Sequence, residues 1–461
     1  MRYVSTRGEA PALGFGEAMM TGLASDGGLY VPEVVPVMGA GEIAGLAGLP
    51  YEEAAFRVMR PFVGDFFGEG EFRRLIDEAY ASFGHRARVP LVQVAENHFL
   101  LELFHGPTLA FKDVAMQLIG RMFEAALARR GGRIAIVGAT SGDTGSAAIE
   151  AFRGRAGVDV FVLFPHGRVS EVQRRQMTAP SEANVHALAV DGDFDDCQAA
   201  LKAMFADRDF AGTVGLAGVN SINWARVLAQ VVYYVTAAVS LGAPHRAVSF
   251  TVPTGNFGDV YAGLIARRMG VPIERLVVAT NRNDILHRTL QTGEHRKEGV
   301  VPTISPSMDI QVSSNFERAL FDAYGRNAAA VRADMSSLRE GGFTVGQGAI
   351  DALREWFASG RASEAETAAA IARTLKEAGE LVCPHTAVGL HVAEGFLSAT
   401  PMVTLATAHP AKFPDAVEAA TGVRPPLPPR MADLYERPER VTRVPNDLDA
   451  LKSIVLERLA A

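Results

Sequence analysis

Short apolar runs alternate with amphipathic segments from about Arg133 into the last quarter of the chain. Each run ends in glycine or a polar turn, and the intervening segments repeat apolar residues with a helical period. The runs predict strands at 133–138, 159–164, 185–190, 248–252, 276–280 and 403–406. The segments predict helices at 144–152, 171–178, 194–205, 223–239, 260–269 and 315–324. This alternation is typical of parallel sheets covered by helices.

Three stretches depart from this alternation. Residues 1–95 combine helical pieces with Gly/Pro-rich turns and are expected to form a separate N-terminal unit. Within a catalytic region at 96–425, strand signals fade between about 284 and 360, which predicts a smaller, loop-rich and inserted or lid-like part. Residues 426–461 are expected to form a C-terminal tail that ends in a short helix. One helix start is marked clearly, because Ser363 and Glu366 form a capping box before an alanine-rich run.

Composition indicates a globular protein of about two or three domains. Of 461 residues, 48% are apolar and 21% are charged, which argues against disorder. The net charge of -7 argues against nucleic acid or an anionic membrane as a partner, because both need basic patches. Any anion that the chain binds must therefore be held by local donors.

The two cysteines, Cys197 and Cys383, lie far apart in the sequence and outside any CxxC or Cys/His cluster. This argues against a disulfide framework and against a metal site, and it fits a reducing cytoplasm. The N-terminus lacks an apolar core with a cleavage site, and the longest apolar run, 231–239, is too short to span a bilayer. We therefore expect a soluble, unprocessed cytoplasmic protein.

Lys112 is the first candidate for chemistry. Only six of the 45 basic residues are lysine, and this one is flanked by Leu109, Ala110, Phe111 and Val114. Apolar surroundings disfavour the charged form of an amine, so they lower its pKa and make it a better nucleophile. The alternative is a structural lysine at a helix edge, whose stem covers Phe111 while its ammonium reaches solvent.

Two glycine-containing loops each connect a predicted strand to a predicted helix. They span 138–145 and 254–259, and their small residues let backbone amides approach an anion at the positive end of a helix. Neither loop has the spacing of a dinucleotide or nucleotide phosphate loop, and a tight turn remains the alternative for the first. Two anion sites beside a nucleophilic lysine are coherent with a pyridoxal 5'-phosphate site.

These residues resemble the threonine synthase family, whose members convert O-phosphohomoserine and water to threonine and phosphate. The resemblance spans nearly the whole chain and follows the branch with a long N-terminal domain, as in bacterial and fungal enzymes. Beyond the lysine segment and both loops, the blocks that carry it are Tyr3–Gly8, Leu23–Pro32, Ser313–Arg318, Cys383–Gly389 and Thr407–Phe413. Single blocks are weak signals, but their common order is highly specific.

The resemblance implies an α/β protein with the tryptophan synthase beta-like fold (fold type II). Two subdomains based on parallel sheets and an N-terminal domain are expected. It also implies that Lys112 forms the Schiff base with pyridoxal 5'-phosphate and that Thr407 faces the pyridine nitrogen. The loop that holds the cofactor phosphate would contain Gly255, Asn256, Phe257 and Asp259. At Asp143, related enzymes such as the dehydratases commonly have asparagine.

The implied reaction is a β,γ-replacement on O-phospho-L-homoserine, in which Lys112 also moves protons. Candidates for binding the substrate are Thr140, Ser141, Asp143, Thr144, Arg168, Ser170, Ser314, Asn315 and Arg318. For Ser170 and for the group at 314–318, the alternative is a helix cap with an exposed arginine. His105 either orients the lysine segment or is structural. His409 and Lys412 are further candidates, but Lys412 is expected at the surface.

Three alternatives stay open. One is a serine/threonine dehydratase, another is a threonine synthase-like phospho-lyase that acts on a phosphorylated amino alcohol, and the third is a silent metabolite-binding relative. The intact lysine and both loops argue against the third. The resemblance further implies a monomer or a weak homodimer.

Overall fold

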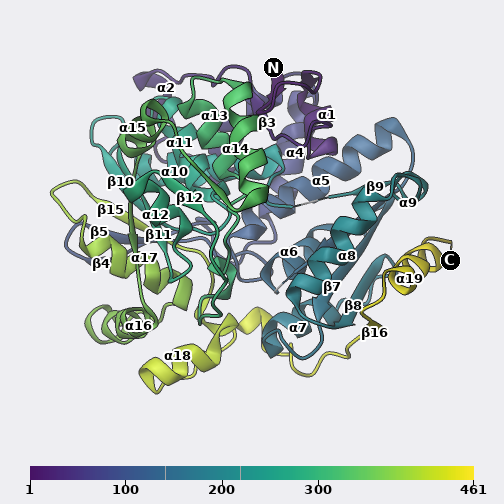
Figure 1. The fold of residues 1–461 in the computed structure, drawn as a ribbon. Helices are drawn as coiled ribbons and strands as arrows, with labels where there is room; N and C mark the ends of the chain where they lie inside the picture. The colour runs from purple at the N-terminus through teal and green to yellow at the C-terminus, as the bar shows by residue number, and fades with distance from the viewer. Residues whose placement is uncertain (141, 219, 461) are drawn as a thin grey trace.

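Two parallel-sheet units and a smaller N-terminal unit make up the chain in the computed structural model, which describes residues 1–140, 142–218 and 220–460 (Figure 1). The larger unit is built on a six-stranded sheet in the order β14-β11-β10-β15-β5-β4. Its strands are β4 (Leu91–Ala95), β5 (His98–Glu102), β10 (Val248–Pro253), β11 (Ile273–Thr280), β14 (Phe357–Arg361) and β15 (Met402–Ala406). All neighbours pair in parallel except the edge strand β4, which is antiparallel to β5.

Helices cover both faces of this sheet because its central strands are apolar on both sides. Along β11, Leu276 and Val278 pack toward one core cluster, whereas Val277 and Ala279 pack toward another, as alternation in a strand requires. The first cluster includes α5 (Lys112–Arg130), α10 (Trp224–Ser240) and α11 (Gly258–Arg268). On the other side lie α17 (Pro384–Glu394) and, beyond it, α16 (Glu364–Ala378).

The smaller unit has a five-stranded parallel sheet in the order β16-β8-β7-β6-β9. Its strands are β6 (Ile134–Ala139), β7 (Val158–Pro165), β8 (Val185–Asp191), β9 (Leu216–Ala217) and β16 (Thr442–Pro445). The helices of this unit are α6 (Asp143–Phe152), α7 (Glu171–Thr178), α8 (Phe194–Ala206), α9 (Arg208–Val214) and α19 (Leu448–Ala460). All eight residues of β7 are buried, which explains why a continuous apolar run identified it.

The six predicted strands are confirmed as β6, β7, β8, β10, β11 and β15. The six predicted helices are confirmed as α6, α7, α8, α10, α11 and α13 (Phe316–Ala323). The capping box is also confirmed: the Ser363 hydroxyl accepts from the Glu366 amide at 3.3 Å, and the Glu366 carboxylate accepts from the Ser363 amide at 2.8 Å.

The N-terminal unit combines a small antiparallel sheet with helices. Its elements are β1 (Arg2–Ser5), β2 (Leu13–Gly14), β3 (Tyr30–Pro32), α1 (Phe15–Thr21), α2 (Ala40–Ala44), α3 (Tyr51–Val63) and α4 (Glu69–Tyr80). It packs on α10, where the ring of Tyr3 lies 5.9 Å from that of Trp224. Strand β4, at the end of the predicted unit 1–95, instead joins the six-stranded sheet.

The expectation of a loop-rich region at 284–360 needs correction. Helices occupy much of it, together with a two-stranded sheet; the elements besides α13 and β14 are α12 (Ile285–Thr292), α14 (Ala328–Glu340), α15 (Gln347–Trp356), β12 (Glu294–Arg296), β13 (Gly342–Thr344) and η1 (Pro306–Met308). The sequence did not reveal α14 and α15 because few of their residues are buried. In α14 only Val331 is buried, and the helix start is fixed by Asn327, which accepts from the amides of Ala329 and Ala330.

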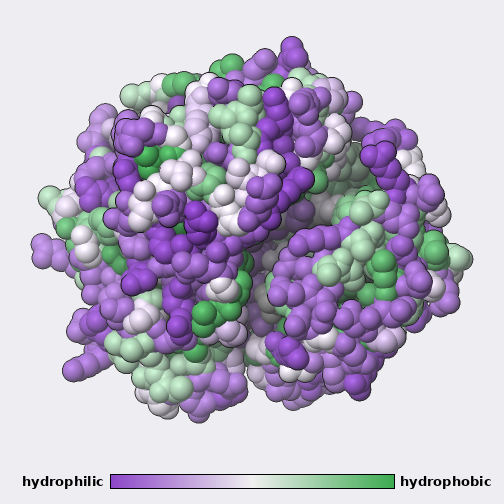
Figure 2. Space-filling view, viewed as in Figure 1, coloured by the Kyte–Doolittle hydropathy of each residue, from purple (hydrophilic) through white to green (hydrophobic). Residues whose placement is uncertain are grey.

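The C-terminal segment contributes more than the predicted tail with its short helix. After η2 (Pro410–Lys412), α18 (Pro414–Thr421) and η3 (Pro429–Met431), the chain crosses from the larger unit to the smaller one, where β16 pairs with β8 (Figure 1). Figure 2 shows a groove between the two units on the face that it presents. Among the described residues, no helix combines the length and the apolar character needed to cross a membrane.

Candidate active site

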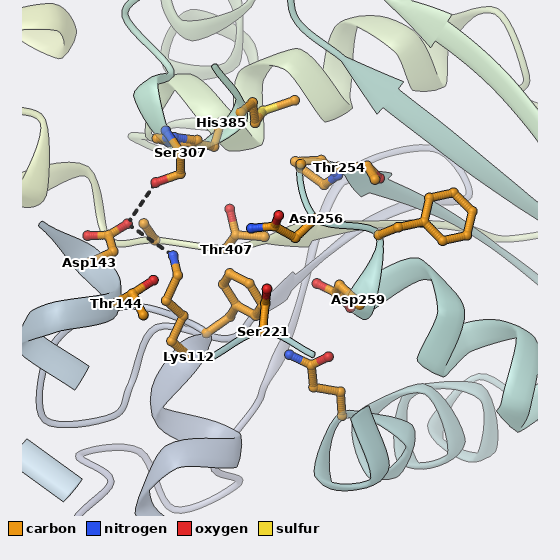
Figure 3. Close-up of a pocket in the computed structure, with 18 of the residues that line it drawn as sticks. Lys112, Asp143, Thr144, Ser221, Thr254, Asn256, Asp259, Ser307, His385 and Thr407 are labelled. Atoms are coloured by element: carbon orange, nitrogen blue, oxygen red, sulfur yellow. Dashed lines mark hydrogen bonds and ion pairs between the residues drawn. The ribbon is translucent and has the colours of Figure 1, made fainter. Parts of the chain in front are cut away.

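A pocket forms where loops from both sheets converge, at the carboxyl ends of the parallel strands (Figure 3). The lining residues come from both sheet units. They are Phe111, Lys112, Asp143, Thr144, Ser221, Arg226, Gln230, Pro253, Thr254, Gly255, Asn256, Phe257, Gly258, Asp259, Ser307, Met308, His385, Thr407 and Ala408.

Lys112 begins helix α5, and the segment before it is fixed by hydrogen bonds. The backbone amide and the hydroxyl of Thr108 each donate to the Asp113 carboxylate at 2.7 Å. The amide of Phe111 donates to the carbonyl of Thr407 at 2.8 Å, which joins the lysine segment to the end of β15. The side chain of Lys112 is 11% exposed, and its Nζ lies 5.0 Å from the centre of the Phe111 ring.

Burial lowers the pKa of Lys112 below that of an ordinary lysine. The carboxylate of Asp143, 3.6 Å from Nζ, acts in the opposite direction, and the charges of Arg226 and Lys412 lower the pKa further. The amine is therefore easier to deprotonate than a surface lysine, which a nucleophile and a proton carrier both require.

Asp143 begins α6 and stays ionised although it is buried. Burial alone would raise the pKa of its carboxyl, but Lys412 and Lys112 together hold the pKa far below its ordinary value. Lys412 Nζ lies 3.0 Å from Asp143 Oδ1, and the Lys412 side chain is fully buried. The prediction of a surface position for Lys412 is wrong, because this buried ion pair keeps its ammonium inside the protein.

The loop before α11 has the shape of an anion site. A Cβ at Gly255 would lie 2.8 Å from the carbonyl oxygen of Ser307, so only glycine fits there. The first N–H groups of a helix have no acceptor within the helix, so the start of α11 offers donors to an anion. Phe257 has φ of +65° and packs its ring against Phe316 and Phe357. The backbone of the loop, and not the Phe257 side chain, therefore faces the pocket.

Asp259 occupies the first turn of α11. Its Oδ1 accepts hydrogen bonds from the hydroxyls of Tyr233 and Tyr234, the latter at 2.9 Å. Burial raises the pKa of Asp259 to about 6. These contacts connect the loop to α10.

His385 Nε2 accepts a hydrogen bond from the Ser307 amide at 3.1 Å. Burial lowers the pKa of His385 to about 4, so the imidazole is neutral at physiological pH. The proton must then be on Nδ1.

The structure brings eight of the predicted site residues to the pocket: Lys112, Asp143, Thr144, Gly255, Asn256, Phe257, Asp259 and Thr407. Asn315 supports the loop from behind, because its Nδ2 donates to the carbonyls of Ser221 and Asn256 at 3.0 Å each. Ser141 lies outside the described residues.

The remaining substrate candidates lie apart from the pocket lining. Arg318 is fully buried and donates to the carbonyls of Tyr30 and Ile222, so it ties the N-terminal unit to the larger unit. The Thr140 hydroxyl accepts hydrogen bonds from the amides of Gly142 and Gly145. Ser170 caps α7, and Arg168 is exposed. Ser314 lies in the turn before α13. His105 binds Glu102 at 2.7 Å, and the side chain of His409 caps η2.

Sequence reasoning missed several pocket residues, above all Ser221, Arg226, Ser307 and His385. Arg226 gave a usable signal, because it is the one charged residue in helix α10. His385 lies in the block Cys383–Gly389, which carries the family resemblance, although no role was predicted for it. Ser307 gave no signal, since only distant packing brings it to the lysine.

Comparison with known proteins agrees with this geometry. Family models described as "Threonine synthase N terminus", "Pyridoxal-phosphate dependent enzyme" and "Threonine synthase, C-terminal" match residues 2–80, 85–337 and 386–455. The threonine synthase of Pseudomonas aeruginosa is 53% identical over 99% of this chain and 98% of its own length.

Two solved structures extend the match to three dimensions. The crystal structure of threonine synthase with bound PLP from Brucella melitensis is 57% identical, covers 100% of both chains and has a TM-score of 0.98. The yeast threonine synthase is 38% identical with a TM-score of 0.95, over 100% of this chain and 99% of that one.

The chain belongs to the threonine synthase family. It is accordingly a pyridoxal-phosphate dependent enzyme, and the expected tryptophan synthase beta-like fold with two α/β subdomains and an N-terminal domain is confirmed.

The residues of this threonine synthase-family pocket fit the cofactor. Lys112 supplies an amine of lowered pKa, and the start of α11 supplies backbone donors for a phosphate. Gly255 keeps the approach to those donors free of a side chain. The Thr407 hydroxyl lies on the loop after β15 and would be a neutral partner for the ring nitrogen.

We predict that Gly255→Ala weakens cofactor binding at least about tenfold, because the new methyl group must displace the Ser307 carbonyl. Titration of the cofactor-free chain with pyridoxal 5'-phosphate, followed by absorbance, measures the affinity. Gly348→Ala is the matched control, since a Cβ there has nothing within 4 Å. Equal affinities for the two variants would contradict the role of this loop.

Proposed function

We propose that the chain converts O-phospho-L-homoserine and water to L-threonine and inorganic phosphate, the last step of threonine biosynthesis. The observation that carries the proposal is a pocket with a reactive amine and two sets of donors for anionic groups. One set is the backbone at the start of α11, and the other is the side chain of Arg226. A cofactor phosphate and a substrate phosphate together require more donors than one helix start supplies.

Arg226 is the strongest support for an anionic substrate. The residue is buried, it lines the pocket, and its Nε and Nη1 have no hydrogen-bond partner among the described residues. Burial lowers the pKa of its guanidinium to about 10, so the group stays charged at physiological pH. A buried cation with unused donors is costly unless a ligand supplies the acceptors. A phosphate ester matches the planar guanidinium.

The residues of the chain then have distinct roles in moving protons and stabilising charge. Pyridoxal phosphate, when bound, supplies an electron sink that makes protons on an attached amino acid acidic. Lys112 takes and returns protons at the substrate carbons, because its lowered pKa makes both protonation states accessible. Asp143 stabilises the ammonium form of Lys112 while the proton is held.

The same observations favour this reaction over two of its rivals, and phosphate release from different substrates discriminates against the third, the phospho-lyase. A serine or threonine dehydratase needs no cation for a substrate phosphate, and a silent homologue needs no reactive amine. For the assembly, we propose a monomer or a weak homodimer, since the N-terminal unit covers α10, a large apolar helix.

Measuring phosphate release tests the proposal. The purified enzyme is given O-phosphohomoserine, O-phosphoserine and phosphoethanolamine in parallel, and threonine is measured in the products. We expect phosphate and threonine in equal amounts from the first compound, and no turnover by Lys112→Ala. Deamination of serine or threonine without phosphate release from O-phosphohomoserine would contradict the proposal.

Arg226→Met is predicted to lower kcat/KM for O-phosphohomoserine on the order of 10- to 100-fold, the effect of losing one or more hydrogen bonds from a charged donor. Arg267→Met is the matched control, because Arg267 lies at the far end of α11 and outside the pocket lining. A loss for Arg226→Met no greater than that of the control would show that Arg226 does not bind the substrate.

A further inference from the structure

Lys412 is a buried cation that the proposed reaction leaves without a role. Its Nζ donates to the carbonyl of Thr108 at 2.7 Å and to Oε1 of Gln176 at 2.8 Å, and it contacts Oδ1 of Asp143 at 3.0 Å. Three acceptors around one nitrogen require three hydrogens, which only the ammonium form has. Lys412 is therefore a fixed positive charge, and the Asp143 carboxylate lies between it and the reactive amine.

Asp143 connects Lys412 to Lys112. Its Oδ1 binds Lys412 and accepts from Nε2 of Gln173 at 3.0 Å. Its Oδ2 lies 3.6 Å from Lys112 Nζ and accepts from the Ser307 hydroxyl at 3.3 Å, and Figure 3 shows both of these contacts. The carboxylate is thus held on both oxygens, and the closer of the two lysines is Lys412.

Two ammonium groups therefore share one carboxylate. Because Asp143 is partly neutralised by Lys412, it stabilises the Lys112 ammonium less than an unshared carboxylate would, and Lys412 also repels that ammonium directly. The other titratable or charged groups near Lys112 are Arg226 of α10, Asp259 of α11 and His385 of α17, and those near Lys412 are Asp113 of α5 and His409.

We propose that Lys412 is a positioning residue for Lys112: it fixes the Asp143 carboxylate beside the reactive amine and takes up part of its charge, so that Lys112 can release a proton and recover it. The inference rests on the proposed function only in taking Lys112 as the reacting amine. A purely structural Lys412 would tether η2 to the Thr108 segment without affecting the protonation of Lys112.

The test measures the protonation of Lys112 in the full-length chain freed of cofactor. Cyanate is a small reagent that modifies an amine only in its neutral form. The extent of modification of the Lys112 peptide is followed by mass spectrometry across pH and divided by that of a reference amine of known pKa, which corrects for the pH dependence of the reagent and gives a midpoint. For Lys412→Met we expect the midpoint to move toward alkaline pH by about one unit, which means about tenfold less modification at a fixed pH below it. For Asp143→Asn we expect a move of about one to three units toward acid pH.

Matched controls come from the same chain. Lys452→Met removes another lysine paired with an aspartate, Asp207, far from the pocket, and should leave the Lys112 midpoint unchanged. The exposed Lys376 should keep its midpoint in every variant. Circular dichroism shows whether each variant is folded.

An unchanged Lys112 midpoint in folded Lys412→Met, or a move toward acid pH, would overturn the proposal. If Lys412→Met does not fold, the Lys112 midpoint in Asp143→Asn is the test. An unchanged midpoint in that variant would overturn the proposal equally. The modification assay contains neither substrate nor cofactor. A failure of the proposed function would therefore appear in phosphate release and not in these midpoints.

Discussion

A single buried carboxylate, that of Asp143, organises the centre of this molecule. It lies between the ammonium groups of Lys112 and Lys412, which come from the start of α5 and from the segment after β15. Burying these charges separately would cost several kcal/mol each, so they must stay together. The cluster consequently fixes the smaller unit, which carries Asp143, against the larger unit, which carries both lysines, at the point where the pocket opens.

Parallel-sheet topology supplies the rest of the arrangement. The loops after β6, β10 and β15 all leave the carboxyl ends of their strands, and each brings pocket residues to the same place. Helix α11 then contributes its N-terminal donors to the pocket, and α10 contributes Arg226. The N-terminal unit acts from a distance, because Arg318 joins the carbonyl of Tyr30 to Asn315, which supports the loop at 254–258.

Much of this fold could be predicted because its central strands are buried on both faces and read as apolar runs. Strands β5, β14 and β16 escaped prediction, since they contain polar residues such as His98, Arg361 and Arg443. The lysine, the glycine loop and Thr407 could be placed in one site from their sequence motifs. Lys412 could not, because only the tertiary structure reveals that a lysine between two prolines faces an aspartate 269 positions earlier in the chain.

The most direct test of the proposed site identifies the amine that carries the cofactor. Borohydride reduction of the purified enzyme, followed by peptide mass mapping, fixes the pyridoxyl group to the lysine that holds it. We expect the added mass on the peptide that contains Lys112, with the peptide that contains Lys412 unmodified. A pyridoxyl group on Lys412, or on none of the six lysines, would contradict it.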